Sequence, residues 1–258
     1  MSSASGAPFE GVRALVLGAS GFIGRWVARA LAARGAAVVY AVRDRAAFEP
    51  IRRAWSLAGP VIEADLSRPD SVGALLREVR PSVTFNLAGY GVDRCERDGH
   101  LSHLLNAELP GRAAEAMAAV RDPRWPGVDL VHTGSALEYG TLGGDLAEDS
   151  LPQPTTVYGK SKLAGTRAVA AASREHGLKA VTARLFTVYG PGEHTGRLLP
   201  TLLEAARGYF AEQTRETKWK SLIPEGTKSE LLPSEIMVKG DLPSMASIPL
   251  GSLDQSGV

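Results

Sequence analysis

Three side chains of this sequence have the types and spacing needed to move a proton, namely Ser135, Tyr158 and Lys162. Tyr158 and Lys162 are four residues apart, so they share one face if the stretch is helical. A free tyrosine phenol has a pKa of about 10, and a nearby ammonium group favours the phenolate and lowers that pKa. We therefore expect Tyr158 to be a catalytic acid or base, Lys162 its partner, and Ser135 the hydroxyl that holds a substrate oxygen beside Tyr158.

A glycine-rich segment near the start of the chain has the pattern of a phosphate-binding turn. It follows the apolar run 14–17 and opens the amphipathic stretch 22–33. Its glycines allow a sharp turn and leave no side chain where a pyrophosphate must approach. We expect a dinucleotide to bind at this strand-to-helix turn, through Gly18, Ser20, Gly21, Phe22, Ile23 and Gly24. Together with the tyrosine and lysine, this turn predicts a nicotinamide-dependent redox enzyme.

The end of the next predicted strand indicates which nicotinamide cofactor is bound. An acidic residue there would accept a hydrogen bond from the ribose 2′-OH of NAD, whereas this chain has Arg43. A guanidinium can pair with the 2′-phosphate of NADP. NADP is therefore the preferred cofactor and NAD the alternative, in which Arg43 is a solvated loop residue and Asp44 contacts the ribose.

Six apolar runs alternate with helical patterns along the chain. The runs predicted to be strands are 12–17, 37–42, 61–64, 82–88, 128–133 and 180–185. Their continuous hydrophobicity favours burial on both faces, and so an α/β fold with a doubly wound parallel sheet, the Rossmann fold. The longest predicted helices are 101–120 and 158–176, the second ending at Gly177.

Composition excludes several classes of function. The 258 residues have a formal charge of +1. This charge is too small to indicate binding to nucleic acid or to an anionic membrane. There is no apolar run of membrane-spanning length, and the pair His100 and His103 completes no convincing metal site. The lone Cys95 cannot form an intramolecular disulfide, and residues 1–10 lack the features of a signal peptide. The expected location is cytoplasmic.

Basic residues change in kind near Gly208. Residues 1–208 hold 21 Arg and 3 Lys, whereas residues 209–258 hold 1 Arg and 4 Lys. Helical and strand periodicity is also lost there, and prolines interrupt the sequence. We predict a dinucleotide-binding domain over 1–208, carrying the catalytic residues, and a reduced, loosely packed or disordered appendage over 209–258.

From about residue 12 to 208 the sequence resembles the extended short-chain dehydrogenases/reductases, in the branch of nucleotide-sugar epimerases, dehydratases and reductases. Besides the three motifs above, this resemblance rests on Asp65-Leu66, the segment 86–89, Asn106 with Gly111, and the segment 184–191. It implies that Tyr158 is the catalytic acid/base with Lys162 and Ser135 in the roles given above. It also implies further cofactor contacts from Asp65, Leu66, Leu87, Ala88, Gly89, Asn106, Tyr158, Lys162 and Phe186.

Departures from the family pattern narrow the expected reaction. Members with 4,6-dehydratase activity carry an Asp-Glu pair where this chain has Ala136 and Leu137, so dehydration is disfavoured. Hydride transfer at a nucleotide-sugar carbon remains, as a 4-epimerase or a 4-keto reductase. Arg43 favours the reductase, whereas the segment 184–191 is more typical of epimerases.

The alternative function is a catalytically silent NAD(P)-binding module. It is favoured by residues 209–258, which do not match the family's diphosphate-clamping lobe. We accordingly expect ordinary affinity for the cofactor and weak or no binding of nucleotide sugars. If the protein is a homodimer, we expect the helices at 101–120 and 158–176 to form its interface.

Overall fold

A computed structural model of the chain describes residues 7–92 and 96–215. Cys95 and residues 216–258 of the predicted appendage lie outside the described residues. The chain divides into two compact units, one ending at Gly192 and one beginning at Glu193.

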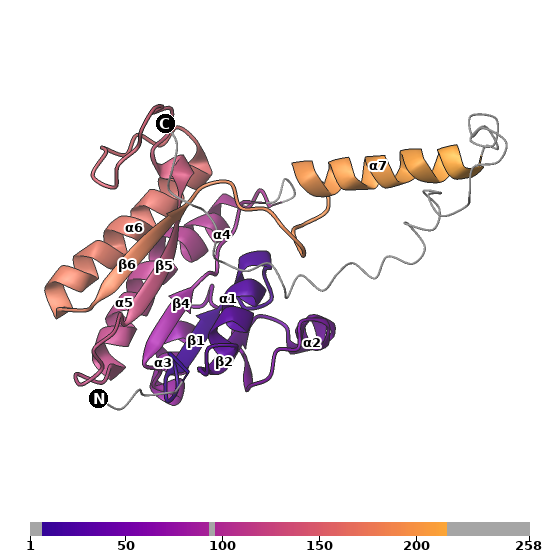
Figure 1. Cartoon of the computed structure of the whole chain (residues 1–258). Coiled ribbons are helices and arrows are strands. Elements are labelled where there is room, and N and C mark those ends of the chain that lie inside the picture. Colours follow the sequence, from indigo (N-terminus) through magenta and orange to yellow (C-terminus); the bar gives the residue numbers. More distant parts are fainter. Residues whose placement is uncertain (1–6, 93–95, 216–258) are drawn as a thin grey trace, which may run out of the picture. The chain divides into compact units, whose positions relative to one another are not determined.

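The first unit is built on one parallel sheet (Figure 1). Its strands are β1 (Arg13–Leu17), β2 (Ala37–Val42), β3 (Val61–Glu63), β4 (Val83–Asn86), β5 (Leu130–Ser135) and β6 (Ala180–Leu185). Their order is β3-β2-β1-β4-β5-β6, and every neighbouring pair is parallel. This order confirms the predicted Rossmann fold. Because the chain crosses from β3 back to β4 beside β1, the carboxyl ends of β1 and β4 form the switch point where ligands bind in such sheets.

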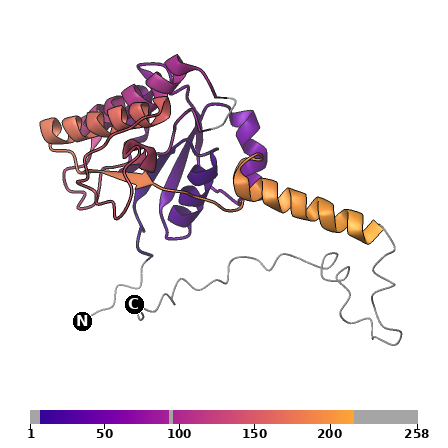
Figure 2. The ribbon, with the colours of Figure 1, turned by 90° about the horizontal axis from the view of Figure 1, so that it is seen from above.

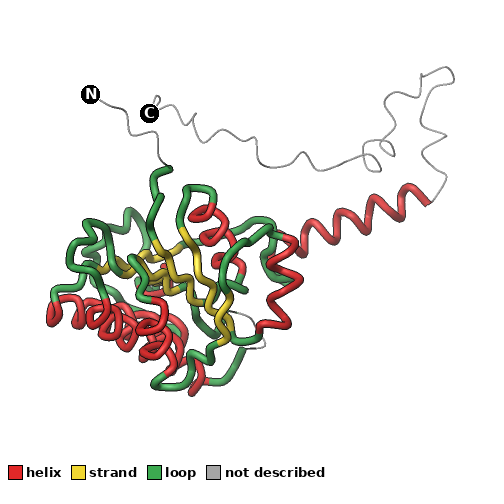
Figure 3. The backbone as a smooth tube through the Cα atoms, turned by 90° about the horizontal axis from the view of Figure 1, so that it is seen from below, coloured by secondary structure: helices red, strands yellow, loops and turns green. Residues whose placement is uncertain are grey.

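Helices cover both faces of β1, β2 and β4 (Figures 2 and 3). One face packs against α1 (Phe22–Ala32) and α2 (Arg45–Ala54) through a core that includes Val16, Tyr40 and Phe48. The other packs against α3 (Ser71–Val79), α5 (Leu109–Val120) and α6 (Val157–His176). Burial on both faces explains the continuous apolar runs of these strands.

Strand β6 differs from this pattern. Val181 and Ala183 point away from α6 along one face of β6, and Val181 is 45% exposed. Among the described residues up to Gly192, no helix covers that face. The prediction of burial on both faces is therefore wrong for β6, because the apolar pattern of a strand does not say whether a later segment will cover it.

The predicted helix 101–120 is three successive pieces. These are α4 (Gly99–His103), the π-helical turn η1 (Leu104–Glu108) and α5. Pro110 has no N–H to donate to the carbonyl of Asn106, which breaks the α-helical ladder at this point. A Cβ on Gly165 of α6 would lie 2.1 Å from that carbonyl oxygen, so α6 packs directly on the π-helical turn.

Helix α6 has both of its expected ends. Thr156 caps its start by accepting a hydrogen bond from the N–H of Gly159 at 2.9 Å. Gly177 ends it in the left-handed conformation, with φ of 60°, which favours glycine. These ends confirm the predicted helix 158–176 within one residue.

The second unit contains α7 (Leu198–Arg215). Arg197, just before it, pairs with Glu193 at 3.3 Å. The helix passes through position 208, where the composition changes, so the first residues of the predicted appendage are helical. None of the described helices is both long enough and apolar enough to cross a membrane.

Candidate active site

The glycine-rich turn joins β1 to α1 at the switch point of the sheet. Gly18 has φ of +78°, and a Cβ there would lie 2.9 Å from the nitrogen of Ala88. A Cβ at Gly24 would lie 2.2 Å from the carbonyl oxygen of Gly18, so α1 packs directly on the turn. Gly21 is the N-cap of α1, and no side chain of the described residues caps the first N–H groups. Backbone N–H groups at a helix start that no side chain caps are suited to bind a pyrophosphate.

The other three residues predicted to bind the cofactor here are Ser20 in the turn and Phe22 and Ile23 at the start of α1. Ser20, Phe22 and Ile23 are half-buried. The carbonyl oxygen of Ser20 accepts a hydrogen bond from Arg25 at 3.1 Å. A side chain of α1 thus holds the backbone of the turn that precedes this helix.

The end of β2 presents Arg43 to solvent. Its neighbour Asp44 caps α2, because its carboxylate accepts a hydrogen bond from the N–H of Ala47 at 2.8 Å. One carboxylate oxygen of Asp44 is thus engaged at the start of α2. Arg43 is an exposed charged residue at this strand end, followed by the exposed Asp44 and Arg45.

Asp65 and Leu66 follow β3, beside the end of β2. Hydrogen bonds from the hydroxyl and N–H of Ser67, at 2.6 and 3.1 Å, hold the pKa of Asp65 below its usual value. The charges of Arg68 and Arg43 lower it further. Asp65 is therefore an exposed carboxylate close to Arg43, and Leu66 is half-buried against the core.

The segment after β4 is held by Asn106. The buried side-chain amide of Asn106 donates to the carbonyl oxygen of Tyr90 at 2.7 Å and accepts from its N–H at 3.0 Å. Leu87 and Ala88 lie against the glycine turn, where the N–H of Leu87 donates to Leu17. Asn106 thus fixes the loop that carries Gly89, and any contribution of Asn106 to cofactor binding is made through that loop.

Ser135 is the last residue of β5 and is 8% exposed. It caps the short 3₁₀ turn η2 (Ala136–Glu138): its Oγ accepts from the N–H of Leu137 at 3.2 Å. The Glu138 carboxylate returns the contact by accepting from the N–H of Ser135 at 2.8 Å. Since the Ser135 oxygen acts here as an acceptor, its O–H stays available to donate to a substrate oxygen.

The start of α6 lies directly against this turn. A Cβ on Gly159 would lie 2.4 Å from the carbonyl oxygen of Leu137, so only glycine allows the helix so close. On the other side, a Cβ on Gly91 would lie 3.3 Å from Cδ2 of Tyr158. The first turn of α6 therefore packs between η2 and the loop after β4. This packing places Tyr158 near the edge of the sheet where β5 ends at Ser135.

Lys162 lies one helical turn after Tyr158 and is 3% exposed. Burial lowers its pKa to about 8, and the negative charge of Glu138 partly opposes that effect. A Cβ on Gly89 would lie 3.9 Å from its Nζ. The Lys162 amine thus reaches from α6 to the loop after β4.

Glu138 is a buried carboxylate that the sequence analysis did not assign. It pairs with Arg184 of β6, whose Nε lies 3.0 Å from its Oε2, and it accepts from Thr166 at 3.1 Å. Arg184 also donates to the Tyr139 hydroxyl and to the Glu148 carbonyl oxygen, both at 2.9 Å. This network joins η2, α6 and β6 behind Ser135.

A signal for Glu138 was present in the sequence. Ser135-Ala136-Leu137-Glu138 matches the capping-box pattern, in which a serine and a glutamate three residues later cap each other's backbone. The pattern predicts the local turn but not the burial of the carboxylate or its partner. Arg184 lies 46 residues away and is brought to Glu138 by the pairing of β5 with β6.

His132 lies in the core behind Lys162. Its Nδ1 is 3.3 Å from Nδ2 of Asn86, and both side chains are fully buried. Burial and the positive charge of Lys162 lower the pKa of His132 to about 3. The imidazole is therefore neutral, which adds no second positive charge beside the lysine.

Phe186 follows β6 and is 61% exposed. Its ring centroid lies 6.4 Å from that of Tyr139.

Of the predicted site residues, the structure gathers the glycine turn, Leu87 to Gly89, Ser135, Tyr158 and Lys162 at the carboxyl ends of β1, β4 and β5. Arg43 and Asp65 lie farther along the same edge, at the ends of β2 and β3.

Comparison with known proteins shows which family the chain belongs to. The model of the NAD dependent epimerase/dehydratase family matches residues 14–223, a longer stretch than the resemblance expected from the sequence. A dTDP-6-deoxy-L-talose 4-dehydrogenase (NAD(P)(+)) from Kitasatospora kifunensis is 34% identical over 218 residues, covering 82% of this chain and 63% of the relative. A dTDP-4-dehydrorhamnose reductase from Burkholderia thailandensis is 30% identical over 227 residues, covering 85% and 66%.

A solved structure shares the fold. The UDP-glucuronic acid 4-epimerase of Bacillus cereus, in complex with UDP-glucuronic acid and NAD, has a TM-score of 0.63 and 25% identity. The match covers 74% of this chain and 63% of that one. The chain thus spans just under two thirds of the length of each of these three proteins.

Proposed function

The chain belongs to the NAD dependent epimerase/dehydratase family, and from this premise we propose that it transfers a hydride between a nicotinamide cofactor and carbon 4 of a nucleotide sugar. The relatives support this position on the sugar, since their names are those of 4-dehydrogenases, 4-dehydro-sugar reductases and 4-epimerases. The reducing direction, from a 4-keto sugar to the alcohol, is the first form of the proposal. Epimerisation is the second.

One observation carries the proposal: α6 packs on η2 so closely that Gly159 meets the carbonyl oxygen of Leu137. Through this contact, the sheet edge that holds Ser135 and the helix that holds Tyr158 and Lys162 form one rigid wall. An exposed helical Tyr-Lys pair, the structural alternative, would need no such contact and no burial of the lysine. Positioning of an acid beside a hydrogen-bond donor is what proton transfer to a carbonyl requires.

The cofactor would be held mainly by backbone. The turn 18–24 would bind the pyrophosphate, Asp65 and Leu66 the adenine, and the loop 87–89 with Lys162 the nicotinamide ribose. When bound, the nicotinamide ring supplies the hydride for reduction or accepts it for oxidation. Arg43 would pair with a 2′-phosphate, and because Asp44 caps α2, we propose NADP as the preferred cofactor.

The chain's own groups would handle the proton and orient the sugar. In reduction, carbon 4 gains the hydride and the Tyr158 phenol gives its proton to oxygen 4. Ser135 donates a hydrogen bond to the same oxygen and so stabilises the negative charge that develops on it. The Lys162 ammonium stabilises the phenolate that remains, and Glu138 keeps Lys162 charged despite its burial. In oxidation each step reverses.

The test combines binding with turnover. We expect calorimetry to show that NADPH binds with micromolar affinity, and that dTDP-4-dehydrorhamnose, at high concentration, then causes loss of reduced-cofactor absorbance. Weak sugar binding is expected, because the diphosphate contacts implied by the family are not matched by this sequence. Ser135→Ala should lower the rate, and Asp122→Asn, which removes one charge of an exposed ion pair with Arg124, should not.

The possible results separate the functions. NMR of UDP-glucuronic acid incubated with NAD⁺ would reveal the epimerase form. Cofactor binding without turnover of either sugar would favour the silent module. Failure of both NADPH and NADH to bind would contradict the proposal altogether.

A further inference from the structure

Trp26 links the first helix to the segment that follows β6. It lies on α1, two residues after the glycine turn, and is 36% exposed. Its indole Nε1 donates to the carbonyl oxygen of Pro191 at 3.0 Å, across 165 residues of sequence. A long-range hydrogen bond from a half-exposed side chain to a loop backbone fixes that loop rather than the core.

A second tryptophan completes the contact. Trp55, just after α2, meets Trp26 edge to face with ring centroids 4.9 Å apart. The guanidinium of Arg25 lies 5.5 Å from the Trp55 ring centroid. A Cβ on Gly192 would lie 2.9 Å from Trp55 and 3.1 Å from Arg25. We call Arg25, Trp26 and Trp55 the clasp, because they hold the backbone of Pro191 and Gly192.

The clasp also reaches the glycine turn. Arg25 donates through Nε to the carbonyl oxygen of Gly21 at 3.2 Å and through Nη2 to that of Ser20 at 3.1 Å. Both carbonyl groups belong to the turn 18–24. One guanidinium thus contacts the turn on one side and the Trp55 ring on the other.

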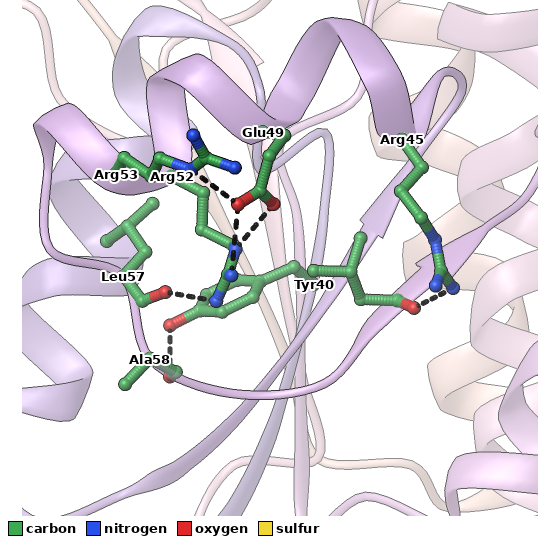
Figure 4. A network of polar contacts seen from close by, with 8 residues as sticks. Tyr40, Arg45, Glu49, Arg52, Arg53, Leu57 and Ala58 are labelled. Atoms are coloured by element: carbon green, nitrogen blue, oxygen red, sulfur yellow. Dashed lines mark hydrogen bonds and ion pairs between the residues drawn. The ribbon is translucent and has the colours of Figure 1, made fainter.

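The backbone shortly after Trp55 is held by the network in Figure 4, which ends on Leu57 and Ala58. The Tyr40 hydroxyl donates to the carbonyl oxygen of Ala58 at 2.8 Å, and Arg52 donates to that of Leu57 at 3.4 Å while pairing with Glu49 at 2.9 Å. Ser56, directly after Trp55, has φ of 52°, a conformation that non-glycine residues keep only when their surroundings hold it. The chain that leaves Trp55 is therefore held by its neighbours at residues 56–58.

We propose that Trp26 is a positioning residue that couples the cofactor-binding turn 18–24 to the segment 186–192. The inference rests on the cofactor site of the proposed function. A cofactor seated on the turn would fix the Ser20 and Gly21 carbonyls, hence Arg25 and the clasp, and so would restrict the segment that carries Phe186 and Tyr189. These two exposed aromatic side chains would then be ordered for the sugar only when the cofactor is present.

Hydrogen exchange with and without NADP⁺ tests this coupling in the whole chain. Trp26→Phe keeps an aromatic ring on Trp55 and removes the N–H that binds Pro191. We expect amides of 188–192 to exchange about fivefold faster in this variant, the factor that corresponds to one lost hydrogen bond. We also expect NADP⁺ to slow their exchange in the wild type and to lose most of that effect in the variant, while it still protects 18–24 in both.

Trp125→Phe is the matched control, since Trp125 also donates its Nε1 to a backbone carbonyl oxygen, that of Val128 at 3.1 Å, away from this site. It should leave the exchange of 188–192 unchanged. Because coupling is reciprocal, Trp26→Phe should also weaken NADP⁺ binding by up to the same fivefold factor.

The results separate this inference from the proposed function. Equal NADP⁺ protection of 188–192 in Trp26→Phe and wild type would overturn the coupling. Lack of protection at 18–24 in the wild type, with NADP⁺ and NAD⁺ alike, would instead contradict the cofactor site itself.

Discussion

The half of the sheet from β1 to β3 and the half from β4 to β6 build their parts of the site by different means. In the first half, the glycine turn offers backbone N–H groups and no ionisable side chain, and charged groups such as Glu49 and Arg53 lie near the surface. In the second half, Glu138 and Lys162 are buried, and His132 is buried and neutral beside them.

This difference has consequences for stability and for chemistry. Backbone donors need only the right turn, so the first half depends on space, as at Gly18 and Gly24. Buried charges need partners, because an unpaired ion in the interior is strongly destabilising. The second half therefore depends on the pairing of charges, and substitutions of similar chemistry should act very differently in the two halves.

The largest effect should come from Glu138→Gln. Removal of this charge leaves the largely buried Arg184 without its anion, and loss of one partner of a buried pair typically costs about 3 kcal/mol or more. Urea denaturation followed by circular dichroism measures the change in free energy of unfolding. Glu49→Gln, whose carboxylate pairs with two arginines on the surface of α2, is the control and should have little effect. Equal destabilisation by the two would remove the contrast between the halves.

Tyr158→Phe should lower turnover of the 4-keto sugar by about 10²-fold or more, the usual loss for a positioned acid. The fold should change little, because the ring stays in place. Tyr40→Phe, on β2, is the control in the other half of the sheet. This variant loses the hydrogen bond to the Ala58 carbonyl oxygen, so it should lower the free energy of unfolding but leave the turnover per folded molecule unchanged. Undiminished turnover in Tyr158→Phe would exclude this residue from the mechanism.

His132 should make the fold sensitive to acid. Its folded-state pKa of about 3 is lowered from the usual 6.5, so its contribution is fully present above pH 6.5 and is lost as the unfolded chain binds a proton below that pH. Between pH 7 and pH 5 this linkage amounts to about 2 kcal/mol. Urea titrations at both pH values should show that loss in the wild type and much less of it in His132→Asn. An identical pH dependence in the variant would place its origin elsewhere.

Arg43→Ala should have the smallest effect, confined to cofactor choice. We expect the wild type to bind NADPH more tightly than NADH, and the variant to lose about tenfold of that preference, as one charge-assisted contact is removed. Arg53→Ala, another exposed arginine nearby in sequence, should leave the preference intact. Calorimetric titration with both cofactors measures it, and equal wild-type affinities for NADPH and NADH would rule out the role of Arg43.

Local patterns were sufficient for most of the fold. All six strands lie within or close to the predicted apolar runs, and α1 and α6 begin where predicted, because strand burial and helix caps are encoded in neighbouring residues. The helix 101–120 was less well predicted, since the effect of Pro110 depends on Gly165 of another helix approaching the freed carbonyl. The roles of Ser135, Tyr158, Lys162 and Arg43 stay predictions until the variants above are measured.

The sequence by itself determined the family, the order of the strands along the chain and the residue types available at the site. Those depend on motifs such as the glycine turn and the Tyr158–Lys162 spacing, whose meaning is local. Only the tertiary structure decided which charges are buried and with whom they pair: Glu138 with Arg184, and Lys162 beside His132. The physical reason is that desolvation and pairing arise between residues on different strands and helices, which come together only when the parallel sheet forms.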